Sequence, residues 1–128
     1  MFNNVLVIDD EPTFRRVIAR NLRMRGLHVR EAETVGEAMG EINAARPDLL
    51  LLDLNLPDRT GWDVLRELRE EGKQVPTIIL SAIRVSDSKL QEFRPMAYLP
   101  KPFPIEALLR LVIGPAVEEA NDGEAAQA

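Results

Sequence analysis

The chain has 128 residues, of which 45% are hydrophobic, and it carries a formal net charge of −5 at pH 7. This length suits one domain with a core of its own, and the negative charge argues against direct binding of nucleic acid. The chain has no cysteine and only one histidine, which excludes disulfides, thiol catalysis and most histidine-based metal sites.

The first predicted elements are a buried strand and a helix. Residues 5–8 form a short apolar run rich in β-branched side chains, which is typical of a strand inside a parallel sheet. Three acids follow, and then Pro12, whose missing N–H suits the first turn of a helix. Gly26 would end this helix. Its core face is predicted to have Phe14, Val17, Ile18 and Leu22, and its opposite face Arg15, Arg16, Arg20, Arg23 and Arg25.

A second strand and a second helix come next. Residues 27–32 are more polar, as expected for a strand at the edge of a sheet. Thr34 and Glu37 have the spacing of a capping box, with Thr34 at the N-cap. The helix should end before Pro47, because the residue that precedes a proline avoids helical geometry. Its inward-facing residues are predicted to be Ala38, Met39, Ile42 and Ala45.

Four consecutive leucines at residues 49–52 form a continuous apolar run. Such a run is typical of a central parallel strand that helices cover on both faces. Asp53 stands at the carboxyl end of this strand, and in open α/β sheets ligands bind at that edge. Taken alone, Asp53 would more readily be explained as a residue that caps a loop.

A third helix and a fourth strand follow the leucines. The strand is expected at residues 75–80 and is followed by Ser81. The helix should end near Gly72, and one of its faces presents Trp62, Leu65 and Leu68.

The last part of the chain has a less regular pattern. Leu90 and Phe93 favour a helix of about two turns that begins after Ser86 or Ser88 and is broken by Pro95. A last strand and a final helix are predicted from residues 96–99 and from Ile105, Leu108, Leu109 and Val112.

These elements predict one folded unit over residues 1–113, followed by an acidic, disordered tail or the start of a linker over residues 114–128. No apolar run approaches the ~20 residues of a membrane span, and the amino terminus lacks a signal-peptide pattern. A cytoplasmic protein without a membrane segment is therefore expected.

Strand and helix alternate five times, which predicts an α/β fold with a doubly wound, five-stranded parallel sheet and helices on both of its faces. The strand order 2-1-3-4-5 fits best, because it makes the three most apolar strands central.

This topology brings chemically active side chains to one edge of the sheet. The acids of this set repel one another and need a cation, and carboxylate oxygens suit Mg²⁺. With Mg²⁺ bound, a carboxylate can act as the nucleophile toward a phosphoryl group, while a hydroxyl and an ammonium donate to the phosphate oxygens. Each residue alone has an ordinary structural explanation, but together they indicate a site. The set is Asp9, Asp10, Asp53, Ser81 and Lys101.

The same residues resemble the receiver domain of two-component response regulators, and the chain is similar to the single-domain chemotaxis regulator. The matching motifs are Val-Ile-Asp-Asp-Glu-Pro at residues 7–12, Leu-Leu-Asp-Leu-Asn-Leu-Pro at 51–57 with Gly61 beyond, Ser81-Ala82, and Tyr-Leu-Pro-Lys-Pro-Phe at 98–103. The resemblance covers residues from about 4 to 113. It implies a receiver domain that is not an enzyme but a phosphate-accepting signalling domain.

The resemblance also implies roles for individual residues. Asp53 would accept the phosphoryl group from a histidine kinase or a histidine phosphotransfer protein, and Ser81 and Lys101 would bind it. On activation, Ser81 and the aromatic Tyr98 would move together, and the bond between Lys101 and Pro102 would be cis.

The implied metal is Mg²⁺, with Mn²⁺ as a substitute. Asp10, Asp53 and the backbone carbonyl of Asn55 would hold it, and Asp9 would act through water. A downstream protein or a fused effector domain would receive the signal. Dimerisation through the last helix and its neighbouring strand is compatible with the sequence but is not indicated by it.

Two other functions stay open from the residues. One is a pseudo-receiver that binds partners without phosphorylation, and the other is a Mg²⁺-dependent phosphohydrolase, for which Asn55 stands where a second Asp is usual. A dinucleotide-binding enzyme is weaker still, because no Gly-x-Gly-x-x-Gly follows the first strand.

The segment between Ser81 and Lys101 departs from the family pattern because it is a couple of residues shorter. We therefore predict a short or displaced fourth helix and raised mobility over residues 83–95, which uniformly slow hydrogen exchange there would refute. Ile83, two residues beyond Ser81, is bulky and apolar and is predicted to limit the attack of water on an aspartyl phosphate.

Overall fold

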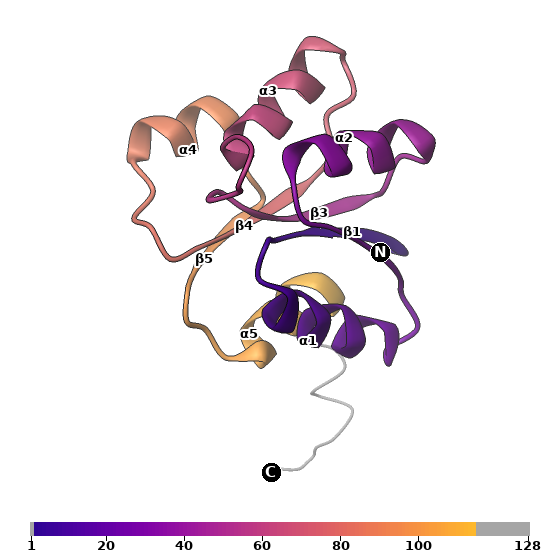
Figure 1. The fold of residues 1–128 in the computed structure, drawn as a ribbon. Helices are drawn as coiled ribbons and strands as arrows, with labels where there is room; N and C mark the ends of the chain where they lie inside the picture. The colour runs from indigo at the N-terminus through magenta and orange to yellow at the C-terminus, as the bar shows by residue number, and fades with distance from the viewer. Residues whose placement is uncertain (1, 115–128) are drawn as a thin grey trace.

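The computed structural model describes residues 2–114 and has five strands that alternate with five helices (Figure 1). The strands are β1 (Asn4–Ile8), β2 (His28–Ala32), β3 (Leu49–Asp53), β4 (Thr77–Ser81) and β5 (Ala97–Pro100). The helices are α1 (Pro12–Arg23), α2 (Val35–Ala44), α3 (Gly61–Glu70), α4 (Asp87–Phe93) and α5 (Ile105–Ile113).

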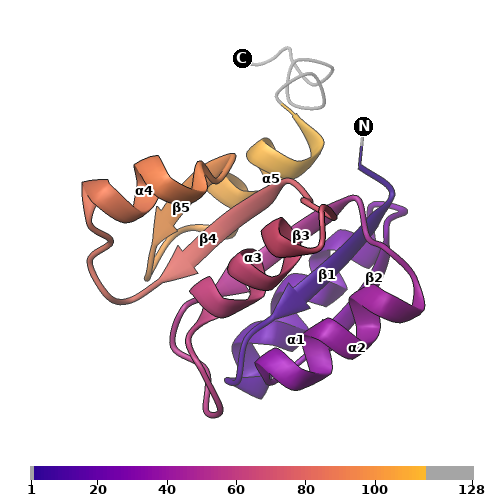
Figure 2. The same ribbon diagram turned by 90° about the horizontal axis from the view of Figure 1, so that it is seen from above.

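All strand pairs are parallel, and the order in the sheet is β2-β1-β3-β4-β5, so the predicted topology is confirmed. Figure 2 shows the labelled strands running in one direction. The helices α2, α3 and α4 cover one face, whereas α1 and α5 cover the other (Figure 1). None of the described helices is long and apolar enough to cross a membrane.

The leucines of β3 connect the two halves of the core. Leu50 and Leu52 pack into the cluster under α2 and α3, whereas Leu49 and Leu51 pack into the cluster under α1 and α5. All four are fully buried, because neighbouring strands cover the edges of β3 and helices cover both of its faces. The strand that ends in Asp53 is therefore packed against strands at both edges and helices on both faces, which fixes the position of its end.

The start of α2 confirms the predicted cap in part. The Thr34 side chain accepts a hydrogen bond from the Glu37 N–H at 2.9 Å, as expected of an N-cap. The Glu37 carboxylate, however, accepts from the Glu33 N–H rather than from that of Thr34. The helix ends at Ala44, so Ala45 is an exposed, extended cap, and its predicted place in the core was wrong.

Two residues of α1 lie opposite to their predicted faces. Val17 is 49% exposed, whereas Arg15 is only 5% exposed. The Arg15 guanidinium donates from Nη1 to the backbone oxygen of Asp9 at 2.8 Å and from Nε to Glu31 at 2.9 Å. Because these partners satisfy its charge and its donors, Arg15 can be buried between α1 and the edge strand β2.

The helix α4 is short, as predicted, and none of its residues is buried. Ser86 is its N-cap, and Arg94, with a φ of 48°, ends it directly before Pro95. Leu90 and Phe93 pack against the core, and Phe93 stacks on Trp62 of α3 at a centroid distance of 5.1 Å and an interplanar angle of 15°. The predicted mobility of this segment remains a prediction. The tail beyond residue 114 lies outside the described residues.

Candidate functional site

The site forms where the parallel strands end. Asp9 directly follows β1, Asp53 and Ser81 are the last residues of β3 and β4, and Lys101 directly follows β5. The common direction of the strands brings these residues to one edge, although they are far apart in the sequence. The structure brings the three acids and Lys101 together at this edge.

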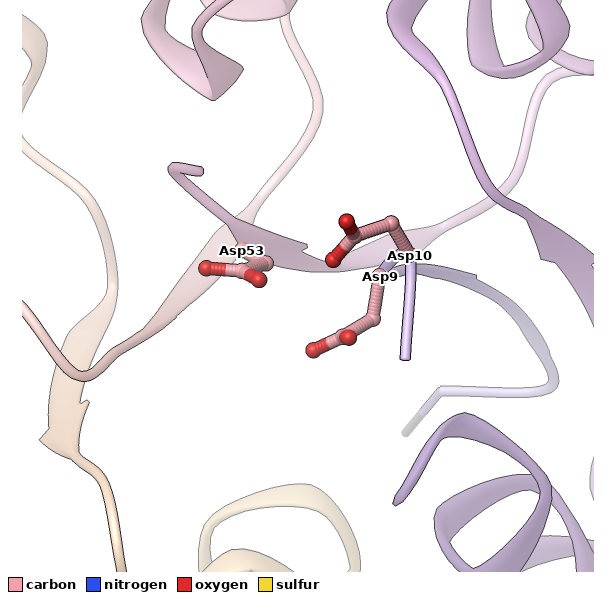
Figure 3. A group of neighbouring side chains, drawn as sticks. All are labelled: Asp9, Asp10 and Asp53. Carbon is pink, nitrogen blue, oxygen red and sulfur yellow. The ribbon is translucent and has the colours of Figure 1, made fainter. Parts of the chain in front are cut away.

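The three carboxylates of Asp9, Asp10 and Asp53 face a common space (Figure 3). One oxygen from each residue lies within 4.8 Å of the others. Asp9 and Asp53 are buried, whereas Asp10 is exposed. Three negative charges this close repel one another, and an all-oxygen set with an open side fits a hard divalent cation such as Mg²⁺.

Lys101 supplies the positive charge of the crevice. Its Nζ lies 2.8 Å from Asp9 Oδ2 and 3.4 Å from Asp53 Oδ2. The bond between Lys101 and Pro102 is cis. The Lys101 N–H donates to the Ser81 carbonyl at 2.8 Å, which ties the backbone of Lys101 to the end of β4. Lys101 is thus aimed inward, and its charge offsets part of the negative charge of the acids.

The Asp53 carboxyl is placed in a setting that disfavours its charge. Burial raises its pKa above the ordinary value of 3.8, and the nearby negative charge of Asp9 adds to this effect. A hydrogen bond from the Asn55 N–H to Oδ1 at 3.2 Å and the ammonium of Lys101 act against it, but the pKa remains raised. The crevice therefore favours states in which the negative charge of Asp53 is neutralised or shared with another group.

This raised pKa predicts how an Asp53→Asn substitution affects stability. Between pH 3.8 and the higher pKa of the folded state, the Asp53 carboxyl is ionised in the unfolded chain but still protonated in the folded protein, so the wild-type protein loses stability as the pH rises across that window. The neutral amide carries no such penalty. Without metal, the variant should therefore gain stability relative to the wild type as the pH rises through this window, and the gain should level off above it.

Urea unfolding in the presence of EDTA, repeated from acidic to neutral pH, measures this difference. Asp58→Asn is the opposite control, because hydrogen bonds from the backbone N–H groups of Val35 and Gly36 lower the pKa of Asp58. A stability difference between Asp53→Asn and wild type that does not change with pH would contradict the prediction.

The backbone of Gly61 packs closely against the backbone of Asp53. A Cβ at position 61 would lie 2.3 Å from the backbone oxygen of Asp53 and 3.0 Å from the Cα of Leu54. The Gly61 N–H donates to the Leu54 carbonyl at 2.9 Å, and an isolated bridge joins Asn55 to Thr60. The loop after β3 therefore folds back onto the end of the strand, and only glycine fits at this contact.

Ser81 and Tyr98 share a partner that sequence reasoning did not find. The Ser81 hydroxyl donates to the backbone carbonyl of Ile83 and accepts from its N–H, both at 3.0 Å. The Tyr98 hydroxyl donates to the same carbonyl at 3.3 Å. The two residues with a predicted switching role are thus connected through Ile83, and no pattern in the sequence signals this backbone contact.

Two other residues near the site were also missed. Arg15 holds the backbone of Asp9, and the ring centroid of Phe14 lies 4.2 Å from Lys101 Nζ. Helical periodicity alone predicts that Arg15 faces solvent and Phe14 faces the core. It gives no information about the carbonyl and carboxylate that let Arg15 be buried, or about the ammonium that contacts Phe14.

The fold and this crevice define a class: a doubly wound parallel α/β protein with an acidic cluster and a lysine at the carboxyl edge. A family profile for the response regulator receiver domain matches residues 5–113. The chain belongs to this family, the receiver domains of two-component response regulators.

Curated relatives include transcriptional regulators. The chain is 39% identical over 115 residues to the KDP operon transcriptional regulatory protein KdpE of Escherichia coli, which covers 86% of this chain and 51% of the relative. It is 33% identical over 111 residues to the DNA-binding transcriptional regulator NtrC of Proteus hauseri, over 85% of this chain and 24% of the relative. The chain thus spans about half of KdpE and about a quarter of NtrC.

Solved structures show the same fold. The response regulator TrrA of Thermotoga maritima, in complex with Mg²⁺ and BeF, matches with a TM-score of 0.76 and 30% identity, over 87% of this chain and 96% of the other. A CheY-like receiver domain of Methanospirillum hungatei matches with a TM-score of 0.81 over 96% and 100% of the two chains. At 22% identity, the latter supports the fold alone.

Proposed function

We propose that Asp53 accepts a phosphoryl group from the phosphohistidine of a kinase or phosphotransfer protein, in a reaction that depends on Mg²⁺. The observation that carries this proposal is the crevice, in which Asp53 lies beside Asp9 and Asp10 and within reach of the Lys101 ammonium. A carboxylate oxygen of Asp53 would form the new bond to phosphorus while the phosphorus–nitrogen bond of the donor breaks. The product is an acyl phosphate on the protein.

Asp10, Asp53 and the backbone carbonyl of Asn55 would hold the metal, and Asp9 would act through water. When bound, Mg²⁺ or Mn²⁺ offsets the acidic charge and stabilises the charge of the phosphoryl oxygens. That these acids form a ligand set is supported by the carboxylate oxygens that lie within 4.8 Å of one another. The complex of TrrA with Mg²⁺ and BeF is consistent with such chemistry in this family.

The new phosphate would also change the contacts of Ser81. It adds about −1.5 to −2 charges and three acceptor oxygens at pH 7. Drawing the Ser81 hydroxyl toward a phosphate oxygen would remove it from the Ile83 carbonyl, which is also the partner of Tyr98. The loop before α4 and the ring of Tyr98 would then rearrange together and alter the surface of α4 and β5.

A downstream protein or a fused effector domain would read this surface. The curated relatives are about twice as long or longer and are named as transcriptional regulators, which makes a fused or separate regulatory output the natural candidate. The receiver itself is proposed to bind no nucleic acid directly, in keeping with its net charge of −5.

Ile83 is expected to lengthen the life of the aspartyl phosphate. Ile83 is 56% exposed and lines a cleft of about 280 Å³ together with Trp62 and Asn55, which lies two residues after Asp53. Ile83→Ala should speed the loss of phosphate about threefold to tenfold, because water gains access while the backbone contacts of Ser81 remain. The decay of the phosphorylated protein, followed by intact mass after removal of the donor, measures this rate. Leu111→Ala, at an exposed position on α5, is the control, and equal decay rates in both variants would contradict the expectation.

Acetyl phosphate with Mg²⁺, followed by intact mass, tests the proposed function. The expected result is the gain of one phosphate that is lost with EDTA and in Asp53→Ala. A protein that gains no phosphate from any small donor or kinase would instead be a pseudo-receiver. Turnover of free phosphate esters would identify a phosphohydrolase, and either result would overturn the proposal.

A further inference from the structure

An aromatic ring lies against the phosphate-binding lysine of the crevice. The centroid of Phe14 in α1 is 4.2 Å from Lys101 Nζ, well within the range of a cation–π contact. The ring also packs edge-to-face with Phe103, at a centroid distance of 5.8 Å and an interplanar angle of 81°. Because Phe103 lies only two positions after Lys101, the segment that carries the lysine also holds the ring in place.

The other two contacts of the ammonium are of a different kind. Lys101 Nζ is paired with Asp9 Oδ2 and Asp53 Oδ2, and both residues belong to the acidic cluster that fits a divalent cation. A metal in that cluster would draw on the same carboxylate charge and would repel the ammonium. A hard cation would compete with the ammonium for the two carboxylates, because such cations prefer oxygen ligands. It would not compete for the face of the Phe14 ring.

We propose that Phe14 is a positioning residue for Lys101. Its ring face keeps the ammonium in the crevice when metal engages the carboxylates, so that Nζ is already in place to donate to a phosphoryl oxygen on Asp53. The Lys101 side chain is 18% exposed, so the contact forms in a partly desolvated setting, where attraction to a ring face is stronger than in open water. This inference rests on the proposed function of Asp53.

A series of fluorinated phenylalanines at position 14 tests the proposal. Adding one, two and three fluorine atoms withdraws negative potential from the ring face while nearly preserving its shape. The first readout is the ring-current shift of the Lys101 ε protons by NMR, in Mg²⁺ and without any phosphate donor. The second is the affinity of the Mg²⁺-loaded protein for beryllofluoride, used as the phosphoryl analogue.

The ring-current shift should shrink stepwise along the series, and beryllofluoride affinity should fall in parallel, to about one fifth in Phe14→Leu. The same fluorinated residues at Phe2 serve as the matched control and should change neither readout, because Phe2 is partly buried against the core and has no cation over its ring within residues 2–114. Equal unfolding midpoints across the series would separate the effect from a loss of folding.

Two outcomes would contradict these expectations, and they separate the role of Phe14 from the proposed function of Asp53. Normal beryllofluoride binding by the wild type, with a flat response to fluorination at position 14, would overturn the role of Phe14 and leave the proposed function standing. Failure of the wild-type protein itself to bind beryllofluoride or to gain phosphate would overturn both proposals.

Discussion

Gly61→Ala is expected to lower the free energy of unfolding by about 3 kcal/mol and to slow phosphorylation of Asp53. The added methyl group would lie 2.3 Å from the Asp53 backbone oxygen and 3.2 Å from its carbonyl carbon. A side-chain neighbour could rotate away, but these are backbone atoms of a strand end that its neighbours hold in the sheet. Relief therefore requires the loop after β3 to move, together with the Asn55 N–H that contacts the Asp53 carboxylate.

Gly40→Ala is the matched control, because nothing lies within 4 Å of a Cβ at that position in α2. It should be neutral or stabilise the protein by about 0.5–1 kcal/mol, since alanine is the better helix residue. Urea unfolding gives both free energies, and the intact-mass time course gives the phosphorylation rates. A Gly61→Ala protein as stable and as reactive as Gly40→Ala would show that the close contact at Asp53 has no structural role.

Lys101→Ala is expected to reduce the rate of phosphorylation by about a hundredfold, the usual effect of losing one donor to a developing oxyanion. The same change leaves Asp9, which has no exposed surface, without its ammonium partner at 2.8 Å. Because the loss of one member of a buried ion pair exposes the full desolvation cost of the other, the metal-free variant should also be less stable, by about 2 kcal/mol.

Lys73→Ala is the control for the loss of a lysine. Lys73 pairs with Glu71 at 3.7 Å on the exposed side of the molecule, where an ion pair contributes less than about 1 kcal/mol. It should therefore leave rate and stability almost unchanged. Rates within a factor of two for Lys101→Ala and Lys73→Ala would contradict the role of Lys101 in binding the phosphoryl group.

The fold could be predicted because the strongest patterns in the sequence are repeated along the chain. The leucines at 49–52 are typical of a strand covered on both faces, and the alternation of strands and helices predicted a parallel sheet, as the structure has it. Once the sheet was parallel, the ends of its strands had to share an edge. The meeting of Asp9, Asp53 and Lys101 was thus a consequence of topology rather than of local pattern.

Most of the details that the sequence could not supply depend on contacts between distant segments. Arg15 is buried because Glu31 and the Asp9 carbonyl happen to satisfy it, and helical periodicity contains no information about those partners. The contact of Phe14 with Lys101 likewise joins opposite ends of the chain. Ala45 was misplaced because the end of α2 depends on local capping geometry, which apolar spacing does not report.

Borohydride trapping tests the central claim most directly. This reagent reduces an aspartyl phosphate to homoserine, which marks the modified residue permanently. After treatment with acetyl phosphate and Mg²⁺, reduction and peptide mass spectrometry, homoserine is predicted at position 53 and at neither Asp9 nor Asp10. Homoserine at one of the other two acids, or at none of the three in a protein that has gained phosphate, would contradict the assignment of Asp53 as the phosphoryl acceptor.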